Sequence, residues 1–340
     1  MRLSVVFLIL LLSGCMNREI SQQRYVFGTL VEVSVYGESK AEAEDAINSV
    51  MQKFGQMHLQ LHAWKPSEIT TLNAAFSEGK KLRIDPDVAK IIRDAARLSD
   101  MSKGLFNPAI GRLIGLWGFQ NDEFKPVRPD PEKIKKLVSE NPQMDDIVIE
   151  NDIASSRNPA VRLDLGGFAK GYALDAAAKI LKEKGVKNAL VNIGGNIMAL
   201  GRHGDRPWHV GVKNPRGSGA IAELDLDDGE AIGTSGDYQR YFLLDGKRYC
   251  HIIDPRTGYP AQGVEAVTVL IPKGQNAGAL SDAASKPIFI SGVAGWRQAA
   301  KEMGVDRALL IDENGKVHIT EALYKRIRFE KKDVNPEVVE

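Results

Sequence analysis

Cysteine is scarce in this chain of 340 residues, which contains only Cys15 and Cys250. The pattern around Cys15 predicts that this thiol is modified, so Cys250 has no cysteine partner and an intrachain disulfide is excluded. The fold must therefore be stabilised by buried apolar surface, for which a hydrophobic content of 43% is ample. We expect Cys250 to be a buried filler, with an oxidisable thiol as the alternative.

An excess of charge of one sign is also missing. Lys and Arg together number 45 and Asp and Glu number 44, so the chain has almost no net charge. No bulk field then attracts nucleic acid or an anionic lipid surface. We therefore expect no nucleic-acid partner, and we expect ligands to be recognised at local sites.

Several widespread binding and catalytic motifs do not occur in the sequence. There is no Gly-x-Gly-x-x-Gly segment and no phosphate loop ending in Gly-Lys-Ser or Gly-Lys-Thr, which counts against two common modes of nucleotide binding. There is also no His/Cys cluster with zinc-ligand spacing and no Gly-x-Ser-x-Gly elbow. A hard cation held by aspartate and backbone carbonyl oxygens is still possible, because such a site leaves little trace in a sequence.

A targeting pattern is present at the N-terminus. Met1-Arg2 precedes an apolar run from Leu3 to Leu12, and Ser13-Gly14-Cys15 follow it. The run has about ten residues, about half of what a membrane-spanning helix needs. A secretory signal is therefore favoured over a permanent membrane span.

The segment Leu12–Cys15 resembles the bacterial lipobox, in which the cysteine is lipidated and becomes the mature N-terminus. This resemblance predicts a signal peptide over residues 1–14, lipidation of Cys15 and a tether over residues 15–24. It implies a protein of the bacterial cell envelope that is anchored in a lipid bilayer and faces the periplasm. The alternative is an ordinary secretory peptide with an incidental cysteine.

Apolar periodicity predicts a mixture of helices and strands. Ser39 and Glu42 have the spacing of a capping box, and Asp245-Gly246 predicts a tight hairpin. Helices are expected over residues 39–57, from 67, over 85–98 and 169–184 and from 281, and a surface loop over 126–142. Strands are expected over residues 25–36, 161–165, 190–193, 208–213, 223–226, 238–244, 247–253, 265–271, 308–311 and 316–319.

The order of these elements predicts an α+β fold, with helices layered on a largely antiparallel sheet. The predicted unit covers residues 25–330, as one domain or as two closely packed subdomains. Residues 331–340 are expected to form a C-terminal tail.

The segment from Leu163 to Gly171 carries the strongest chemical signal. Gly166-Gly167 lets the backbone approach a ligand closely, and the following helix N-terminus favours an anion. Lys170 adds a cation in the first turn of that helix. The segment is therefore a candidate phosphate cradle, and the alternative is a tight turn followed by a solvated lysine.

Three other positions have both a chemical and a structural interpretation. His251 is expected at a strand end and suits proton transfer, but it is equally compatible with a satisfied edge residue. Asp282 and Lys286 have the i,i+4 spacing of a helix face, so Asp282 is either a site carboxylate or a helix cap. Trp64 is either a stacking platform or part of the core.

Taken in order along the chain, these segments resemble the ApbE family, the FAD:protein FMN transferases, which are also described as thiamine-biosynthesis lipoproteins. The resemblance runs from about residue 25 to 320 and implies an ApbE-like architecture related to the T-fold. The segments that carry it are Phe27-Gly28-Thr29, residues 67–73, Phe106-Asn107-Pro108, residues 116–119, 164–171, 192–196, 233–236 and 251–258, and Asp282.

The resemblance implies transfer of the FMN half of FAD to a threonine or serine hydroxyl of a partner flavoprotein, with release of AMP. It implies Mg²⁺ as the metal, with Mn²⁺ or Ca²⁺ as alternatives. The implied catalytic residues are His251, for proton transfer, Asp282 and Lys170, and the implied metal ligands are the Gly167 carbonyl, Asp282, Ser285 and Lys286. The implied FAD contacts are Phe27, Trp64, Leu105, Phe106, Asn107, Asp164, Lys170 and Ile253.

Two positions depart from the family pattern. Lys286 stands where many members carry a threonine that ligates the metal, and an ammonium cannot ligate a cation. Either Ser285 and water complete the metal shell, or Lys286 replaces part of the positive charge near the pyrophosphate. Asn107 stands where aspartate is common, which keeps hydrogen bonding but removes a charge.

Two other functions stay open at this stage. The chain is either a transferase, a Mg²⁺-dependent FAD pyrophosphatase that forms FMN and AMP, or a non-catalytic periplasmic lipoprotein that binds and carries FAD. For a transferase, the resemblance implies acceptors with a short Ser/Thr flavinylation motif, among membrane redox-pump subunits or periplasmic reductases.

Overall fold

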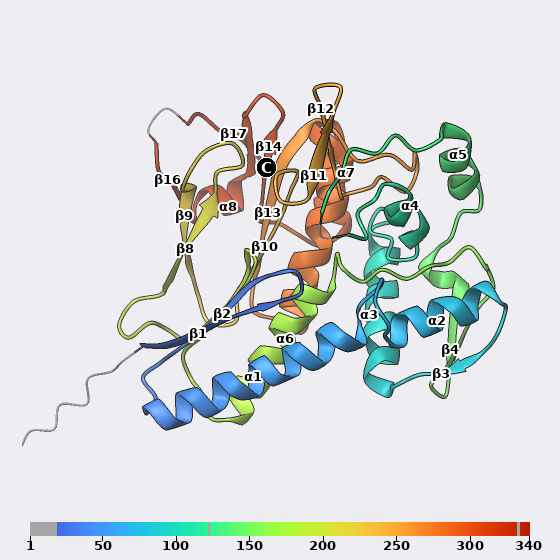
Figure 1. Ribbon diagram of the computed structural model, residues 1–340. Coiled ribbons are helices and arrows are strands. Elements are labelled where there is room, and N and C mark those ends of the chain that lie inside the picture. The colour runs from blue at the N-terminus through green and yellow to red at the C-terminus, as the bar shows by residue number, and fades with distance from the viewer. Residues whose placement is uncertain (1–18, 122, 332–333) are drawn as a thin grey trace, which may run out of the picture.

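The computed structural model describes residues 19–121, 123–331 and 334–340. Long helices pack on one face of a nine-stranded sheet, and a three-stranded sheet covers part of the opposite face (Figure 1). All neighbouring strands of the large sheet are antiparallel except one pair at its edge. The predicted α+β class with a largely antiparallel sheet is therefore confirmed.

The helices follow the expected apolar periodicity, and their caps explain several of their ends. The capping box of Ser39 and Glu42 is present at the first helix. The helices are α1 (Lys40–Gln60), α2 (Glu68–Ser77), α3 (Pro86–Met101), α4 (Gly111–Leu116), α5 (Pro131–Ser139), α6 (Ala169–Glu183), α7 (Ala277–Glu302, kinked at Gly292) and α8 (Glu321–Tyr324), with a 3₁₀ turn at Met144–Asp146.

The large sheet runs in the order β1-β2-β6-β7-β10-β13-β14-β15-β17, and the smaller sheets are β16-β9-β8, β11-β12 and β3-β5-β4. The strands are β1 (Glu19–Val26), β2 (Thr29–Tyr36), β3 (Leu82–Arg83), β4 (Ile147–Glu150), β5 (Ile153–Ser156), β6 (Ala189–Ile193), β7 (Asn196–Leu200), β8 (Trp208–Lys213), β9 (Ala220–Leu226), β10 (Ala231–Gly236), β11 (Tyr241–Leu244), β12 (Lys247–Cys250), β13 (Val264–Ile271), β14 (Ala308–Asp312), β15 (Val317–Thr320), β16 (Ile327–Phe329) and β17 (Glu337–Val339).

The core lies on both faces of the large sheet. Strand β13 is buried along its whole length, and its side chains alternate between the two faces. Val267 and Val269 join the cluster beneath the helices, whereas Ala266 and Leu270 join the cluster beneath β8, β9 and β16. The sheet is therefore a rigid central layer on which the helices position the segments that carry chemistry.

The N-terminal region differs from the sequence prediction. Residues 19–24, expected to be part of a tether, belong to β1 and pair with β2, because their backbone groups complete the edge of the large sheet. The expected single strand over residues 25–36 is interrupted by a turn at Phe27 and Gly28, where both residues have positive φ. The predicted signal peptide and Cys15 lie outside the described residues.

Four other expectations also need correction. Residues 126–142 contain α5, capped by Asp130 and begun by Pro131, so this segment is only partly a loop. Residues 161–165 form no regular strand, because only the N–H groups of residues 162 and 164 donate to the 108–109 segment, while the Asn73 side chain pairs with both backbone groups of Leu163. The last long helix begins at Ala277 rather than near 281, because the Asp175 carboxylate of α6 accepts from the N–H groups of Gly278 and Ala279. The expected tail contains β17, which pairs with β15.

Across the part of the chain that the structure describes, no helix combines the length and the apolar character needed to cross a membrane.

Candidate functional site

The site is built where helices α6 and α7 cross with their backbones in contact. A Cβ atom on Gly171 would lie 2.2 Å from the carbonyl oxygen of Gly278 and 2.6 Å from Cβ of Asp282. Only glycine permits this approach. The N–H of Gly171 therefore reaches Asp282 and donates a 2.9 Å hydrogen bond to Oδ2. This contact holds the first turn of α6 against the first turns of α7.

Asp282 and Lys286 form a buried ion pair on α7. Their side chains are 1% and 14% exposed, and the Lys286 ammonium donates to Oδ1 of Asp282 and, at 2.7 Å, to its carbonyl oxygen. Burial would raise the pKa of the Asp282 carboxyl, but Lys286, Lys170 and the Gly171 N–H outweigh it and hold that pKa below its ordinary value. Burial lowers the pKa of Lys286, and the Asp282 carboxylate opposes that effect. The i,i+4 spacing seen in the sequence is thus a real contact.

Ser285 is buried beside this pair. Its hydroxyl lies 2.7 Å from the hydroxyl of Ser235 on β10 and donates to the carbonyl oxygen of Asp282 at 2.8 Å. The resemblance to the family includes residues 233–236 but implies no role for Ser235. The structure makes it the partner that orients Ser285.

Lys170 and His251 lie within electrostatic range of the same pair. Burial and then the repulsion of Arg240, Lys170 and Lys286 lower the pKa of His251 to about 3. The Nδ1 atom of His251 lies 3.3 Å from the carbonyl oxygen of Arg240, which can only accept, so Nδ1 carries the proton. The lone pair is then on Nε2, and His251 is a neutral imidazole.

We expect His251 to stay neutral from pH 8 down to about pH 4. Its folded pKa lies below the ordinary value near 6.5, so the unfolded chain binds the extra proton first. The contribution of His251 to stability is therefore complete above about pH 6.5 and is lost as pH falls toward 3. Histidine ring NMR across this range measures the protonation state of His251. Urea unfolding at pH 7.5 and 5 measures its contribution to stability, and the difference between the two pH values should be smaller in His251→Gln. A His251 ring that titrates near pH 6.5 would contradict both expectations.

A second group of expected residues surrounds Trp64. Its indole N–H donates to Oδ2 of Asp164 at 2.8 Å, and the other carboxylate oxygen accepts from the N–H of Gly166. The Arg162 guanidinium lies 4.6 Å from the centre of the Trp64 ring. Sequence reasoning missed Arg162, although it stands just before the glycine loop. Trp64 is therefore held beside the glycine loop at Gly166 by Asp164, and it is not simply a residue of the hydrophobic core.

The remaining predicted FAD contacts with apolar side chains near these segments are Phe27, Leu105 and Phe106. A Cβ on Gly167 would lie 3.5 Å from Cε of Lys286 and 3.7 Å from the Phe106 ring, so these three residues are neighbours. Phe27, at the turn between β1 and β2, makes edge contacts with Phe54 and His58 of α1. Leu105 is half-buried in the turn that precedes Phe106.

Asn107 and Ile253 have structural contacts. The Asn107 side chain is buried, accepts from the N–H of Ala109 at 3.0 Å and donates to the carbonyl oxygen of Pro142 at 2.9 Å. These bonds need an amide at this position, since a carboxylate cannot donate to a carbonyl oxygen. Ile253 is buried in the apolar cluster of α4, α5, β11 and β12. The role of either residue in binding FAD stays a prediction.

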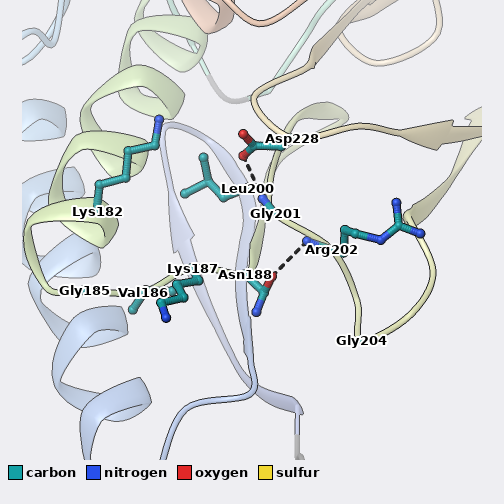
Figure 2. Close-up of a pocket in the computed structure, with 10 residues that line it drawn as sticks. All are labelled: Lys182, Gly185, Val186, Lys187, Asn188, Leu200, Gly201, Arg202, Gly204 and Asp228. Carbon is teal, nitrogen blue, oxygen red and sulfur yellow. Dashed lines mark hydrogen bonds between the residues drawn. The ribbon is translucent and has the colours of Figure 1, made fainter.

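A pocket of about 640 Å³ lies elsewhere, at the far end of α6. Its lining includes Lys182, which is about 18 Å along the helix from Lys170. Figure 2 shows that the side chains of Lys182, Lys187 and Arg202 point in different directions, while Asp228 accepts from the N–H of Gly201. The cations do not converge on one ligand position, so this pocket is not a candidate for the site.

The expected metal ligands are close together, but their arrangement does not suit a divalent ion. Lys286 is bonded to one carboxylate oxygen of Asp282 and the Gly171 N–H to the other. The Ser285 hydroxyl bonds to Ser235 and to a carbonyl oxygen. The fit expected from the resemblance is therefore not supported by the donor set.

A family model described as the ApbE family matches residues 27–309, which includes every part of the site described above. The chain belongs to the ApbE family. This confirms the resemblance found in the sequence, and it accounts for the order of the loops around Trp64, Lys170, His251 and Asp282.

Three relatives place the chain within the ApbE family. A protein of Rhodobacter capsulatus named FAD:protein FMN transferase is 41% identical over 309 residues, which is 91% of this chain and 58% of the relative. One of the same name from Treponema pallidum is 31% identical over 92% of this chain and 89% of the relative. The crystal structure of the ApbE protein of Thermotoga maritima matches with a TM-score of 0.82 and 30% identity, over 93% of this chain and all of that one. The chain thus spans less than two thirds of the Rhodobacter relative but most of the other two.

Proposed function

We propose that this chain is a FAD:protein FMN transferase, which moves the FMN half of FAD onto a serine or threonine hydroxyl of a partner flavoprotein and releases AMP. The activity is the one named for its relatives in the ApbE family. The observation that carries the proposal is the convergence of Lys170, His251, Asp282 and Lys286, from three distant parts of the chain, at one place. A displacement at a pyrophosphate needs concentrated positive charge and a proton acceptor, and these residues supply both.

In the proposed transfer, one bond to phosphorus forms and one breaks. The acceptor hydroxyl oxygen forms a bond to the phosphorus of the FMN half, and the bond from that phosphorus to the bridging oxygen breaks. AMP leaves with the bridging oxygen, and the hydroxyl proton is released. Substrate FAD would be held by the aromatic residues Phe27, Trp64 and Phe106, with Lys170 facing its phosphates.

His251 is the proposed proton acceptor, through Nε2. Its pKa near 3 makes it a weak base in the ligand-free protein. Bound pyrophosphate would offset the repulsion that Arg240, Lys170 and Lys286 exert and would raise that pKa, while burial, the largest cause of the shift, would continue to lower it.

The proposal also includes a cellular location and partner proteins. Lipidation of Cys15 would anchor the protein in the bilayer of the cell envelope and leave the catalytic unit in the periplasm. Acceptors would be membrane redox-pump subunits or periplasmic reductases with a Ser/Thr flavinylation motif. The support is the lipobox-like pattern of the N-terminus and the names of the relatives.

Mass spectrometry tests the transfer directly. The full-length chain in detergent is incubated with FAD and a panel of candidate acceptor domains, and we expect one acceptor to gain one FMN while one AMP is released. The matched control is the same acceptor with its motif hydroxyl residue replaced by alanine, which should gain nothing. Free FMN and AMP with every acceptor unchanged would instead favour the pyrophosphatase, and intact bound FAD would favour the carrier.

A further inference from the structure

The Lys286 ammonium occupies the position at which a cation would meet Asp282. It bonds to Oδ1 and to the backbone carbonyl oxygen of Asp282, and its Cε lies beside Gly167. These contacts are with Asp282 and Gly167, two of the residues that the resemblance assigns to a metal. A fixed positive charge of the side chain is therefore already present where a divalent ion was expected.

The surroundings hold this ammonium in place rather than leaving it to exchange with solvent. The Lys286 side chain is 14% exposed and the Asp282 side chain is 1% exposed. Breaking a buried pair leaves an uncompensated charge, which is strongly destabilising. An incoming divalent ion would have to displace Lys286 from Asp282 and leave an unpaired lysine beside it.

The charge count near the pair favours an anion. Lys170 lies within electrostatic range of Asp282 and Lys286, and Arg240 faces the same His251. Two lysines therefore face one buried carboxylate, and one positive charge is left for a ligand. The pyrophosphate of FAD is an anion of the kind that such an excess would attract.

We propose that Lys286 replaces the divalent cation in this chain, so that the protein binds FAD and transfers FMN without a metal. The inference rests on the proposed function for the nature of the ligand, but not for the absence of a metal. In the transfer, Lys286 would stabilise the negative charge that develops on the pyrophosphate oxygens as the bond to AMP breaks, and no metal would be needed.

Manganese binding tests the inference without relying on activity. The full-length chain is titrated with Mn²⁺ and the bound ion is counted by EPR, while FAD affinity is measured by flavin fluorescence in EDTA and in Mg²⁺. We expect no stoichiometric Mn²⁺ in the unchanged protein and a FAD affinity that differs less than about twofold between the two buffers. One Mn²⁺ per chain that Asp282→Asn removes, or a loss of about tenfold or more of FAD affinity in EDTA, would overturn the inference.

Two variants extend the test. Lys286→Thr frees Oδ1 of Asp282 and adds a hydroxyl, so we expect it to gain one Mn²⁺ and to need metal for tight FAD binding. Lys286→Met removes the charge without adding a ligand, so we expect at least about tenfold weaker FAD binding in EDTA. A Lys286→Met protein that binds FAD as tightly as the unchanged protein would also overturn the inference.

The matched control is Lys90→Thr, which disrupts the more exposed i,i+4 pair of Lys90 and Asp94 and should gain no Mn²⁺. Failure of the transfer assay with metal-independent FAD binding would remove the proposed function, and metal-free transfer with it, but would leave the replacement of the metal by Lys286 in FAD binding standing. Transfer of FMN that requires a metal would support the proposed function and overturn the inference.

Discussion

Gly171→Ala should destabilise the fold by about 3 kcal/mol. The new Cβ would lie 2.2 Å from the Gly278 carbonyl oxygen and 2.6 Å from Cβ of Asp282, which is closer than real contacts allow. Backbone atoms cannot turn aside as a flexible side chain can, so α6 and α7 would have to separate. The separation would also break the hydrogen bond from the residue 171 N–H to Asp282. Urea unfolding measures the loss, and FAD fluorescence measures the accompanying loss of binding.

Gly55→Ala is the matched control. Gly55 is likewise inside a helix, but a Cβ there would have no neighbouring heavy atom within 4 Å. Alanine has the higher helix propensity, so this change should stabilise the protein by about 0.5–1 kcal/mol. A Gly171→Ala protein that unfolds within 1 kcal/mol of the unchanged protein and still binds FAD would show that the two helices do not pack this closely.

The same contact shows where prediction from the sequence succeeds and where it stops. Local signals were read correctly: the capping box at Ser39, the Asp245-Gly246 hairpin with positive φ at both residues, and the helix that follows Gly167. Each of these depends on neighbours a few residues away. The bond from Gly171 to Asp282 joins positions 111 residues apart, and nothing in the spacing of either segment indicates it.

The errors have physical causes of the same kind. The sequence predicts a start of α7 near residue 281, four residues too late, because the N-terminal N–H groups of the helix donate to Asp175 on another helix and not to a residue beside Asn276. Residues 161–165 have the composition of a strand, but their backbone makes only two bonds to the 108–109 segment, and the Asn73 side chain occupies the backbone groups of Leu163. The intrinsic propensity of a segment indicates which secondary structure it can adopt, but the hydrogen-bonding partners that the fold places beside it determine which one it adopts.

The resemblance gave what spacing could not, because it named residues from distant segments as one site. The structure brings Gly167, Lys170, His251, Asp282, Ser285 and Lys286 into one region. It adds Arg162 and Ser235, which no sequence argument had placed there. The resemblance was least informative at Lys286, where the chain departs from the family pattern and its own contacts have to be used instead.

Lys170→Met should lower kcat/KM for FMN transfer by at least about 100-fold. Lys170 is in the first turn of α6 and adds its charge to that of Lys286, so methionine removes a cation that would face the pyrophosphate while keeping most of the side-chain length. A group that stabilises the developing charge affects kcat, whereas one that only attracts FAD affects KM. Initial rates of AMP release over a range of FAD concentrations separate the two effects.

Lys179→Met is the control on the same helix, since the Lys179 side chain is 77% exposed and pairs with Glu183 at 3.9 Å. It should leave transfer unchanged, and unfolding curves of both variants should match that of the unchanged protein. The glycine-rich loop before α6 had two interpretations, a phosphate cradle and a tight turn with a solvated lysine. If Lys170→Met changes kcat/KM less than about threefold, the second interpretation is correct, and the charge for the transfer has to come from Lys286 and the helix N-terminus alone.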